Sequence, residues 1–168
     1  MDLITAIEKA RRSSFRLWIL NFFFERFVPF NLSHKFRIMH IGDNDVKVLL
    51  PYRRKNLNHV KGLHACALAT LTEMTSGFLL AYKLDPKKFR LILRKLDIEY
   101  LYQGKMDAVC DFTLTPEWIK ANIHDSLSHA GSVDVIAEVK IFDIKGNQLT
   151  LGKAHWQIKD WAKVRTKA

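Results

Sequence analysis

One carboxylate stands where the sequence otherwise predicts a buried helix. Glu73 interrupts a run of small and apolar residues, from Ala65 to Ala81, that is apolar nearly all round a helix and therefore predicts an interior element. A carboxylate removed from water needs a partner, a changed protonation state or a function. A carboxylate whose pKa is raised by burial is a better general base than a free one. Glu73 is therefore the first candidate for a catalytic residue.

The start of the same helix offers a complementary group. The first backbone N–H groups of a helix are unpaired, and with the helix dipole behind them they can stabilise negative charge that grows on a carbonyl oxygen. The N–H of Ala65 is the candidate donor, and Asn58, six residues before His64, is a candidate for orienting water or substrate. Eight helical residues separate Ala65 from Glu73 by about 12 Å, too far for both to act on one carbonyl group. A second chain must complete such a site.

Each of these residues also has a simpler interpretation. Glu73 could pair with a basic residue inside a dimer, and Asn58 alone would be a turn residue. His64 fits a structural residue at the helix start better than a base. Cys66 fits a small core residue better than a nucleophile, since nothing in the sequence places a base beside it.

The elements around the central helix follow from periodicity and turn residues. Residues 2–28 predict one helix that ends before Pro29, with a loop over residues 29–34. Residues 36–41 and 46–51 flank a Gly-Asp-Asn-Asp turn and predict a hairpin. A basic loop over residues 52–61 then leads to the central helix, which ends near Pro86.

After that helix the period changes to two, and four more strands are predicted. Residues 89–102 and 106–114 are expected to form an antiparallel pair through the turn Gln103-Gly104-Lys105. Thr115 and Pro116 predict the start of a short helix that ends before Gly131. Residues 132–143 and 148–160 predict a second hairpin. One antiparallel sheet curled round one apolar helix is the natural packing, its outer face covered by the amino-terminal helix, a second protomer or both.

The amino-terminal helix is itself amphipathic. This helix could either pack on the body of the protein or lie on a membrane surface, and packing is the expected alternative. The pattern consists of five apolar residues and one arginine: Phe15, Trp18, Ile19, Phe22, Phe23 and Arg26. The apolar stretch is too short and too charged to span a bilayer. A membrane contact by this helix is therefore not the primary expectation.

Composition favours one compact domain. The chain has 168 residues, 48% of them hydrophobic, and a formal net charge of +10, which implies anionic partners. A nucleic-acid-binding regulator is the least favoured class, because no recognition helix or aromatic strand motif is present. Cys66 and Cys110 form neither a disulfide framework nor a zinc motif, and the histidines have no metal-binding spacing, so we expect no metal and a reducing cytoplasm.

The motif and the order of elements resemble those of the hotdog-fold acyl-CoA thioesterases, especially the phenylacetate-degradation type. In that family an Asn precedes a His-Gly-Gly at the start of the central helix, and an acid follows two turns later; Asn58, His64-Ala65-Cys66 and Glu73 occupy these positions. The segment LDIEYLYQGKMDAVCDF is similar to the family's third strand, glycine turn and fourth strand. The resemblance covers residues 36–160. A less characterised hotdog branch with an amino-terminal helix and an Asn-His, as in Asn58-His59, is also similar.

The resemblance implies an α+β hotdog domain over residues 1–168, with a helical extension at 1–30 and a core at 36–160. It implies thioester hydrolysis at a composite site, in a homodimer whose central helices pack antiparallel, and a homotetramer is open. Glu73, Asn58, His64 and the Ala65 N–H would be the catalytic groups, and no cofactor is needed beyond coenzyme A as part of the substrate. The coenzyme phosphates could be held by two basic groups: Arg53, Arg54 and Lys55 before the helix, and Lys87 and Lys88 after it.

This chain also departs from the family pattern. Ala65-Cys66 replaces Gly-Gly and adds side chains where substrate approaches the backbone. Leu91 and Gly77 lack hydroxyls that relatives use, for which Thr72, Thr75 or Ser76 would have to substitute. A non-catalytic acyl-CoA or lipid binder on the same fold is therefore the alternative function. The sequence leaves open the acyl chain and whether the carrier is coenzyme A or a protein.

Overall fold

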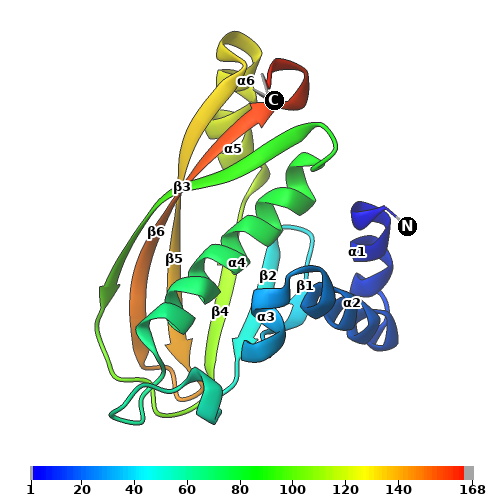
Figure 1. The fold of residues 1–168 in the computed structure, drawn as a ribbon. Helices are drawn as coiled ribbons and strands as arrows, with labels where there is room; N and C mark the ends of the chain where they lie inside the picture. The colour runs from blue at the N-terminus through cyan, green and yellow to red at the C-terminus, as the bar shows by residue number, and fades with distance from the viewer. Residues whose placement is uncertain (1, 165–168) are drawn as a thin grey trace.

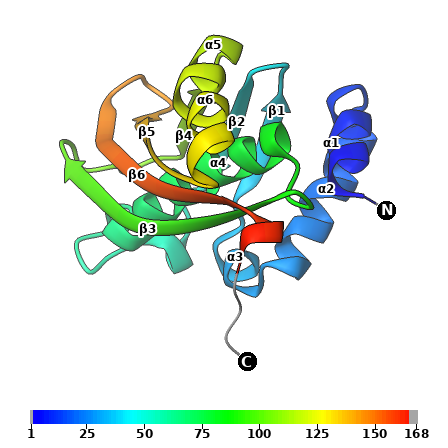
Figure 2. The same ribbon diagram turned by 90° about the horizontal axis from the view of Figure 1, so that it is seen from above.

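The computed structural model describes residues 2–164, except for the side chains of residues 128–130. Six antiparallel strands curve around the long helix α4 (Ala65–Leu84), as Figures 1 and 2 show. The strands are β1 (Arg37–Ile41), β2 (Asp45–Leu50), β3 (Phe89–Tyr100), β4 (Ala108–Thr113), β5 (Ser132–Asp143) and β6 (Gln148–Asp160), in the spatial order β1-β2-β4-β5-β6-β3. The expected α+β architecture, a sheet wrapped around one helix, is confirmed.

The alternation of apolar residues positions the strands on α4. The inward positions of β4 and β5 are buried as predicted, among them Ala108, Cys110, Val135 and Val139. Both predicted hairpins form, β1 with β2 and β5 with β6. The second hairpin turns through Gly146, whose φ of 87° lies in the region that favours glycine.

The helix α4 begins and ends where the sequence predicts. His64 is its N-cap, and at its other end Asp85 leaves the helical conformation with a φ of 57°, directly before Pro86. Leu71, Leu79 and Leu80 are fully buried against the sheet. Residues Ala65–Leu84 are therefore held in one continuous helix against the sheet.

The predicted pairing of residues 89–102 with 106–114 is wrong. Strand β3 pairs with β6 along its whole length, whereas β4 lies between β2 and β5. The segment between β3 and β4 is a crossover held by other elements: the Leu101 N–H donates to the Leu149 carbonyl (2.9 Å), and the Leu63 N–H donates to the Gly104 carbonyl (2.8 Å). The outer edge of β3 consequently has no strand partner within the described chain.

The amino-terminal segment forms three helices instead of one helix and a loop. They are α1 (Leu3–Arg11), α2 (Ser14–Phe27) and α3 (Pro29–His34). The chain breaks between α1 and α2 because Ser13 is extended and its hydroxyl caps α2, accepting from the Arg16 N–H (3.4 Å). Pro29, which we expected to begin a loop, occupies the first turn of α3, where a missing N–H costs nothing.

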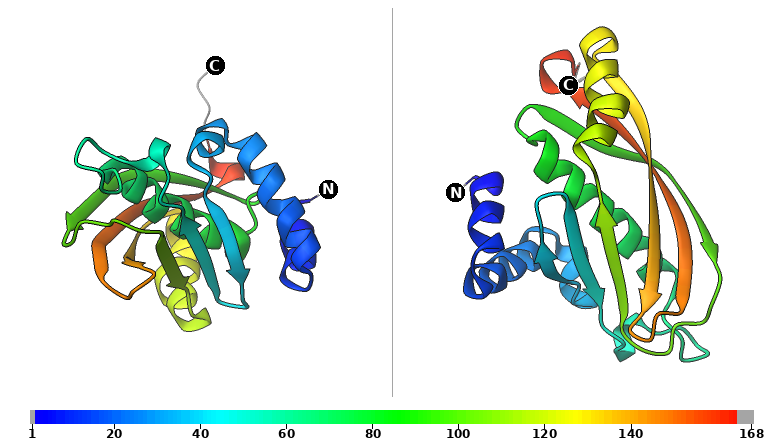
Figure 3. Two further views of the ribbon diagram at one scale, coloured as in Figure 1. Left: turned by 90° about the horizontal axis from the view of Figure 1, so that it is seen from below. Right: turned by 180° about the vertical axis from the view of Figure 1, so that it is seen from behind.

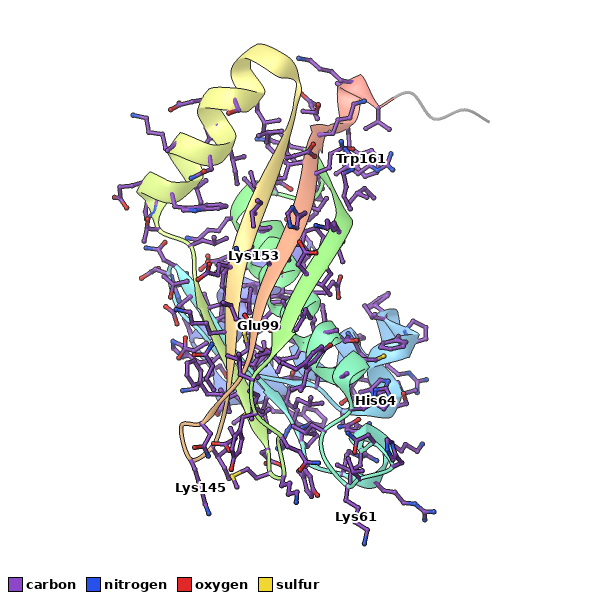
Figure 4. All side chains as sticks on the ribbon, turned by 90° about the vertical axis from the view of Figure 1, so that its left-hand side faces the viewer. Lys61, His64, Glu99, Lys145, Lys153 and Trp161 are labelled. Atoms are coloured by element: carbon purple, nitrogen blue, oxygen red, sulfur yellow. The ribbon has the colours of Figure 1, made fainter. Side chains whose placement is uncertain are left out.

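These helices do not cover the outer face of the sheet, so of the two expected covers the amino-terminal helix is wrong, and a second protomer stays a prediction. Figure 3 shows them beside β1 and α4, at one end of the sheet. Phe24 of α2 meets Phe78 of α4 edge to face (5.7 Å between ring centroids), and Asn21 exchanges two hydrogen bonds with the Ile38 backbone (2.7 and 2.9 Å). The outer face carries charged side chains instead, including Glu99 and Lys153, which Figure 4 labels.

The expected packing face of α2 is also wrong. Phe15 and Trp18 are 66% and 63% exposed, and Phe22 and Phe23 are about half exposed. Leu20 is the buried residue of this helix. Because α2 is apolar on more than one side, periodicity alone could not indicate which side contacts the core. Within residues 2–164 no helix has the length and apolar character needed to cross a membrane.

The remaining helical segments are short. Thr115 caps α5 (Pro116–Ile119), which continues through a π-helical turn, η2 (Lys120–His124), into α6 (Asp125–Ala130) and ends at Gly131, as predicted. Two 3₁₀ turns, η1 (Arg54–Asn56) and η3 (Trp161–Lys163), precede α4 and follow β6. Of these segments only η1 lies next to the start of α4.

Candidate active site

Glu73 lies halfway along α4, on the side that the sheet leaves open. Its carboxylate has no hydrogen bond or ion pair to any described residue, and burial raises its pKa above the ordinary value. An unpaired carboxylate with this surrounding holds its proton more tightly than a solvated one. When ionised, it is correspondingly a stronger base.

A pocket of about 490 Å³ lies in front of Glu73. One wall is the face of α4 from Thr70 to Ala81, and the opposite wall comes from the amino-terminal helices, including Phe24 and Asn31. The sheet contributes Leu91 and Trp156. The lining is largely apolar, as in sites that bind small molecules, and among the described residues Glu73 is its one ionisable group.

Asn31 is a polar residue of this pocket that the sequence analysis missed. It is only 4% exposed, and its side-chain amide has no hydrogen-bond partner among the described residues. Buried amides are normally hydrogen-bonded. An unpaired one that lines the same pocket as Glu73 is available to bind water or a carbonyl group. No motif near Asn31 indicated this role, because α3 reaches the pocket only through tertiary packing.

Thr70 is the second missed polar residue. It lies one turn before Glu73 in the pocket, and its hydroxyl donates to the Cys66 carbonyl (2.8 Å), which leaves its oxygen free to accept. The hydroxyls proposed as substitutes lie elsewhere: Thr72, Thr75 and Ser76 are fully buried and donate to carbonyls of the preceding turn. None of those three lines the pocket.

Close packing against Trp156 explains the glycine at position 77. A Cβ at this position would lie 2.7 Å from the Trp156 ring, whose Nε1 donates to the Ser76 hydroxyl (3.1 Å). The indole thus occupies the space where relatives were expected to carry a hydroxyl. Leu91 lines the pocket from β3 as an apolar wall.

At the start of α4, His64 has a capping role. Its Nδ1 accepts from the Cys66 N–H (3.1 Å), so the ring proton of the neutral side chain is on Nε2. The Ala65 N–H has no acceptor within the described chain, which makes it available to a ligand. Ala65 and Cys66 are both exposed, so the expectation that Cys66 belongs to the core is wrong.

Asn58 shapes the loop before α4. Its Oδ1 accepts from the N–H groups of Val60 (3.1 Å) and Gly62 (2.9 Å), which is the turn role considered above, while its Nδ2 has no partner in the described chain. The structure thus leaves one donor of Asn58 available. It does not line the pocket of Glu73.

Asn56, two residues earlier, is more buried than Asn58 and makes more side-chain hydrogen bonds to other elements. It is fully buried, and its Nδ2 donates to the carbonyls of His34 (2.9 Å) and Pro51 (2.8 Å) while its Oδ1 lies 3.0 Å from the His34 Nδ1. Its own carbonyl accepts from the His64 N–H (2.8 Å). Asn56 therefore ties α3 and β2 to the start of α4. The sequence does not distinguish Asn56 from Asn58, because both asparagines have the same local turn preference.

Within one chain the candidate groups do not meet. Glu73 faces the pocket, whereas Asn58, His64 and Ala65 lie at the amino-terminal end of α4, which Figure 4 marks with His64 and Lys61. The two groups of basic residues are further apart still: Arg53, Arg54 and Lys55 precede α4, and Lys87 and Lys88 follow it, so a helix of about 30 Å lies between them. Lys87 is paired with Asp2 (3.1 Å).

No metal site is apparent in the part of the chain that the structure describes. No three His, Cys, Asp or Glu side chains cluster there in a way that could hold an ion. The chemistry available to the pocket is that of a carboxylate, a hydroxyl, an amide and, at the start of a helix, a free backbone N–H.

The chain matches one protein-family model over most of its length. The model of the family described as "Domain of unknown function (DUF4442)" matches residues 16–158. No curated protein sequence matches the chain.

Several solved structures share the fold. A protein of unknown function from Pseudomonas aeruginosa, described as a "Probable Thioesterase", superposes with a TM-score of 0.77 at 22% identity, covering 92% of this chain and 95% of that one. A thioesterase from Staphylococcus aureus superposes with a TM-score of 0.63 at 16% identity, covering 79% and 99%. A Haemophilus influenzae thioesterase has a TM-score of 0.63 at 8% identity, covering 81% and 86%. At these identities the likeness is one of fold.

Proposed function

Because the chain belongs to the DUF4442 family and has the hotdog fold, we propose that it hydrolyses acyl-CoA thioesters at a composite site between two protomers. The observation that carries the proposal is Glu73: a carboxylate with a raised pKa, without a partner in the described part of the chain, at the wall of an apolar pocket. A buried carboxylate without a partner lowers the stability of the fold, and groups with such a raised pKa cluster at functional sites.

In the proposed reaction the acyl chain lies in the pocket and its thioester carbonyl faces Glu73. The carboxylate takes a proton from a water molecule as that water attacks the carbonyl carbon. The oxyanion accepts a hydrogen bond from the free Ala65 N–H at the start of the partner's α4. Collapse of the tetrahedral intermediate breaks the carbon–sulfur bond and releases the thiolate of coenzyme A, which takes up a proton, together with the carboxylic acid.

Two features of the single chain support pairing with a second copy. The amino-terminal half of α4 leaves the small residues Ala65, Cys66 and Ala69 uncovered or only half-buried beside Thr70 and Glu73, which allows another helix to approach closely. Strand β3, twelve residues long, runs back alongside α4 until the Tyr100 hydroxyl donates to the Ala65 carbonyl (3.1 Å). Among residues 2–164 no strand pairs with its outer edge. Two-fold pairing along this edge would set the two α4 helices antiparallel.

The same arrangement would bring the basic groups together. If Ala65 of one protomer lies beside Glu73 of its partner, the loop that carries Arg53, Arg54 and Lys55 faces the end of the partner's α4, near Lys88. Arg53, Arg54, Lys55 and Lys88 have no ion-pair partner in the described chain. They are the candidates for the phosphates of coenzyme A, and Asn58 Nδ2 and the Asn31 amide are candidates for orienting water or substrate.

The test is release of free thiol from a panel of short, long and aromatic acyl-CoA thioesters. Glu73→Gln keeps the size of the side chain and removes the base, so turnover should fall by about 10²- to 10⁴-fold. Unchanged rates of the variant, or no thiol release from any thioester by the wild type, would refute hydrolysis.

A mixing experiment tests the composite site. Glu73→Gln and Ala65→Pro should each inactivate both sites of a homodimer, but a mixed dimer contains one site with both changes and one with neither. Random exchange should therefore restore about a quarter of the wild-type activity. No recovery after confirmed subunit exchange, or a monomer by light scattering, would refute the arrangement between protomers.

The alternative function is acyl-CoA or lipid binding without turnover. It is favoured by the side chains of Ala65 and Cys66, which stand exposed where the family has glycines. Tight binding of acyl-CoA without thiol release would establish this alternative.

A further inference from the structure

A second hollow adjoins the pocket of Glu73. A groove of about 570 Å³ lies between α1 and α2, and three residues line both: Leu3, Phe24 and Val28. The two spaces therefore adjoin at a shared wall. Their combined lining runs from the middle of α4 to the outer side of the amino-terminal helices.

The direction of this path follows from the elements that line it. The first pocket extends along α4 from Thr70 to Ala81, a distance of about 16 Å. Leu3 and Phe24 then lead away from α4 and between α1 and α2, where Ala6 and Phe23 line the groove from either side. Figure 2 shows these two helices standing beside α4.

The groove is suited to hydrocarbon. Its lining is aliphatic or aromatic apart from Lys9 and Arg16. Phe23 and Phe27 are 47% and 81% exposed when the groove is empty, so an apolar occupant would remove a considerable apolar surface from water.

We propose that the groove between α1 and α2 receives the distal part of a long acyl chain, so that the preferred substrates are long-chain acyl thioesters. The proposal rests on the proposed function for the position of the thioester at Glu73. What identifies the occupant is position: an acyl chain that fills the pocket of Glu73 ends against Leu3, Phe24 and Val28, and the same three residues line the groove. The amino-terminal helices α1 and α2 then determine the specificity for acyl-chain length.

The expected size of the preference follows from burial. Each methylene moved from water into the groove should raise kcat/KM by about fourfold until the groove is filled. Short chains that end within the first pocket gain nothing from α1 and α2. Wild-type kcat/KM should therefore rise steeply from acyl chains that end beside Gly77 to those that pass Phe24.

Ala6→Phe is the informative variant, because Ala6 lines the groove but not the pocket of Glu73. A phenyl ring there should block the groove, lowering kcat/KM for palmitoyl-CoA at least tenfold while hexanoyl-CoA is hydrolysed as before. Thr5→Phe is the matched control: it adds a phenyl ring to the same helix at the adjacent exposed position, which lines neither space, and should leave both substrates unaffected.

The outcomes separate this inference from the proposed function. If wild type and Ala6→Phe have the same chain-length profile, the groove does not hold the acyl chain, whereas hydrolysis by both would still support the enzyme. If no thioester is hydrolysed, binding of palmitate by the wild type, measured by calorimetry and lost in Ala6→Phe but not in Thr5→Phe, supports the channel without the activity. Equal palmitate binding by all three proteins, or none by any, refutes the channel. A change from dimer to monomer caused by Ala6→Phe alone would instead assign the groove to a second copy of the chain, and would also refute the channel.

Discussion

Replacement of Ala65 by proline would remove the proposed oxyanion donor, the Ala65 N–H, without destabilising the fold. Ala65 is the first residue of α4, where proline is tolerated because the N–H is not part of the helical ladder. The preceding residue, His64, has φ −68° and ψ 136°, the conformation that proline prefers before it. Ala65 is exposed, so the added ring meets solvent.

Ala65→Pro is expected to raise the stability of the protein and to lower its activity. No hydrogen bond of the described chain is lost, and the restricted unfolded chain should stabilise the variant by about 0.4–1 kcal/mol. For a chain of this size that corresponds to an increase in Tm of about 1–4 °C. Loss of one donor to the oxyanion should lower kcat by about 10²- to 10³-fold.

The assay is thiol release from an acyl-CoA substrate beside thermal unfolding of the same preparation. Ala65→Gly, which keeps the N–H and widens the site, is the control and should retain activity with a lower Tm. A proline variant that is stable and fully active would show that the Ala65 N–H does not hold the oxyanion. A proline variant that is unfolded would show that the N–H has a structural partner.

The remaining predictions concern the pocket and its supports. Because burial raises the folded-state pKa of Glu73, its contribution to stability is present below the unfolded pKa and lost as pH rises through the folded pKa. Glu73→Gln should therefore be more stable than wild type at neutral pH and equal to it near pH 4. Urea unfolding at both pH values checks this, and equal stability at pH 7 contradicts it. Asn56→Ala should lower the free energy of unfolding by about 2–3 kcal/mol, because two partly buried carbonyls, those of His34 and Pro51, lose their donor. An effect below about 0.5 kcal/mol would contradict the network. Gly77→Ser should destabilise by about 1–3 kcal/mol through its clash with Trp156 and should not raise turnover; a more active, stable variant would contradict the packing role. Asn31→Leu should leave Tm unchanged or higher while it slows thiol release about tenfold or more, and unchanged kinetics would exclude Asn31 from the site.

Local patterns predicted most elements correctly. The strands follow from alternation, and the caps at Thr115 and Gly131 follow from residues whose preference acts within one turn. The desolvation of Glu73 was predictable for the same reason, since its neighbours along α4 are small or apolar. These features depend on residues that are close in the chain.

The errors have a different origin. The pairing of β3 with β6, and not with β4, depends on which strand edges meet in the folded sheet, and a glycine near a turn carries no information about that choice. The exposed side of α2 could not be predicted because the helix is apolar on several sides. The break after Arg12 was missed because a single serine cap is a weak signal within a long apolar pattern.

In this protein, residues that are close in the chain predict an apolar helix with an isolated acid, its capped start with a free N–H, and six strands, because near neighbours decide periodicity, capping and desolvation. That Asn31 and Phe24 face Glu73 across one pocket, and that the groove between α1 and α2 adjoins this pocket, depends on the tertiary structure. Asn31 and Phe24 lie more than forty residues before Glu73 in the chain. Their contacts depend on how the amino-terminal helices rotate and pack beside α4, which no spacing along the chain specifies.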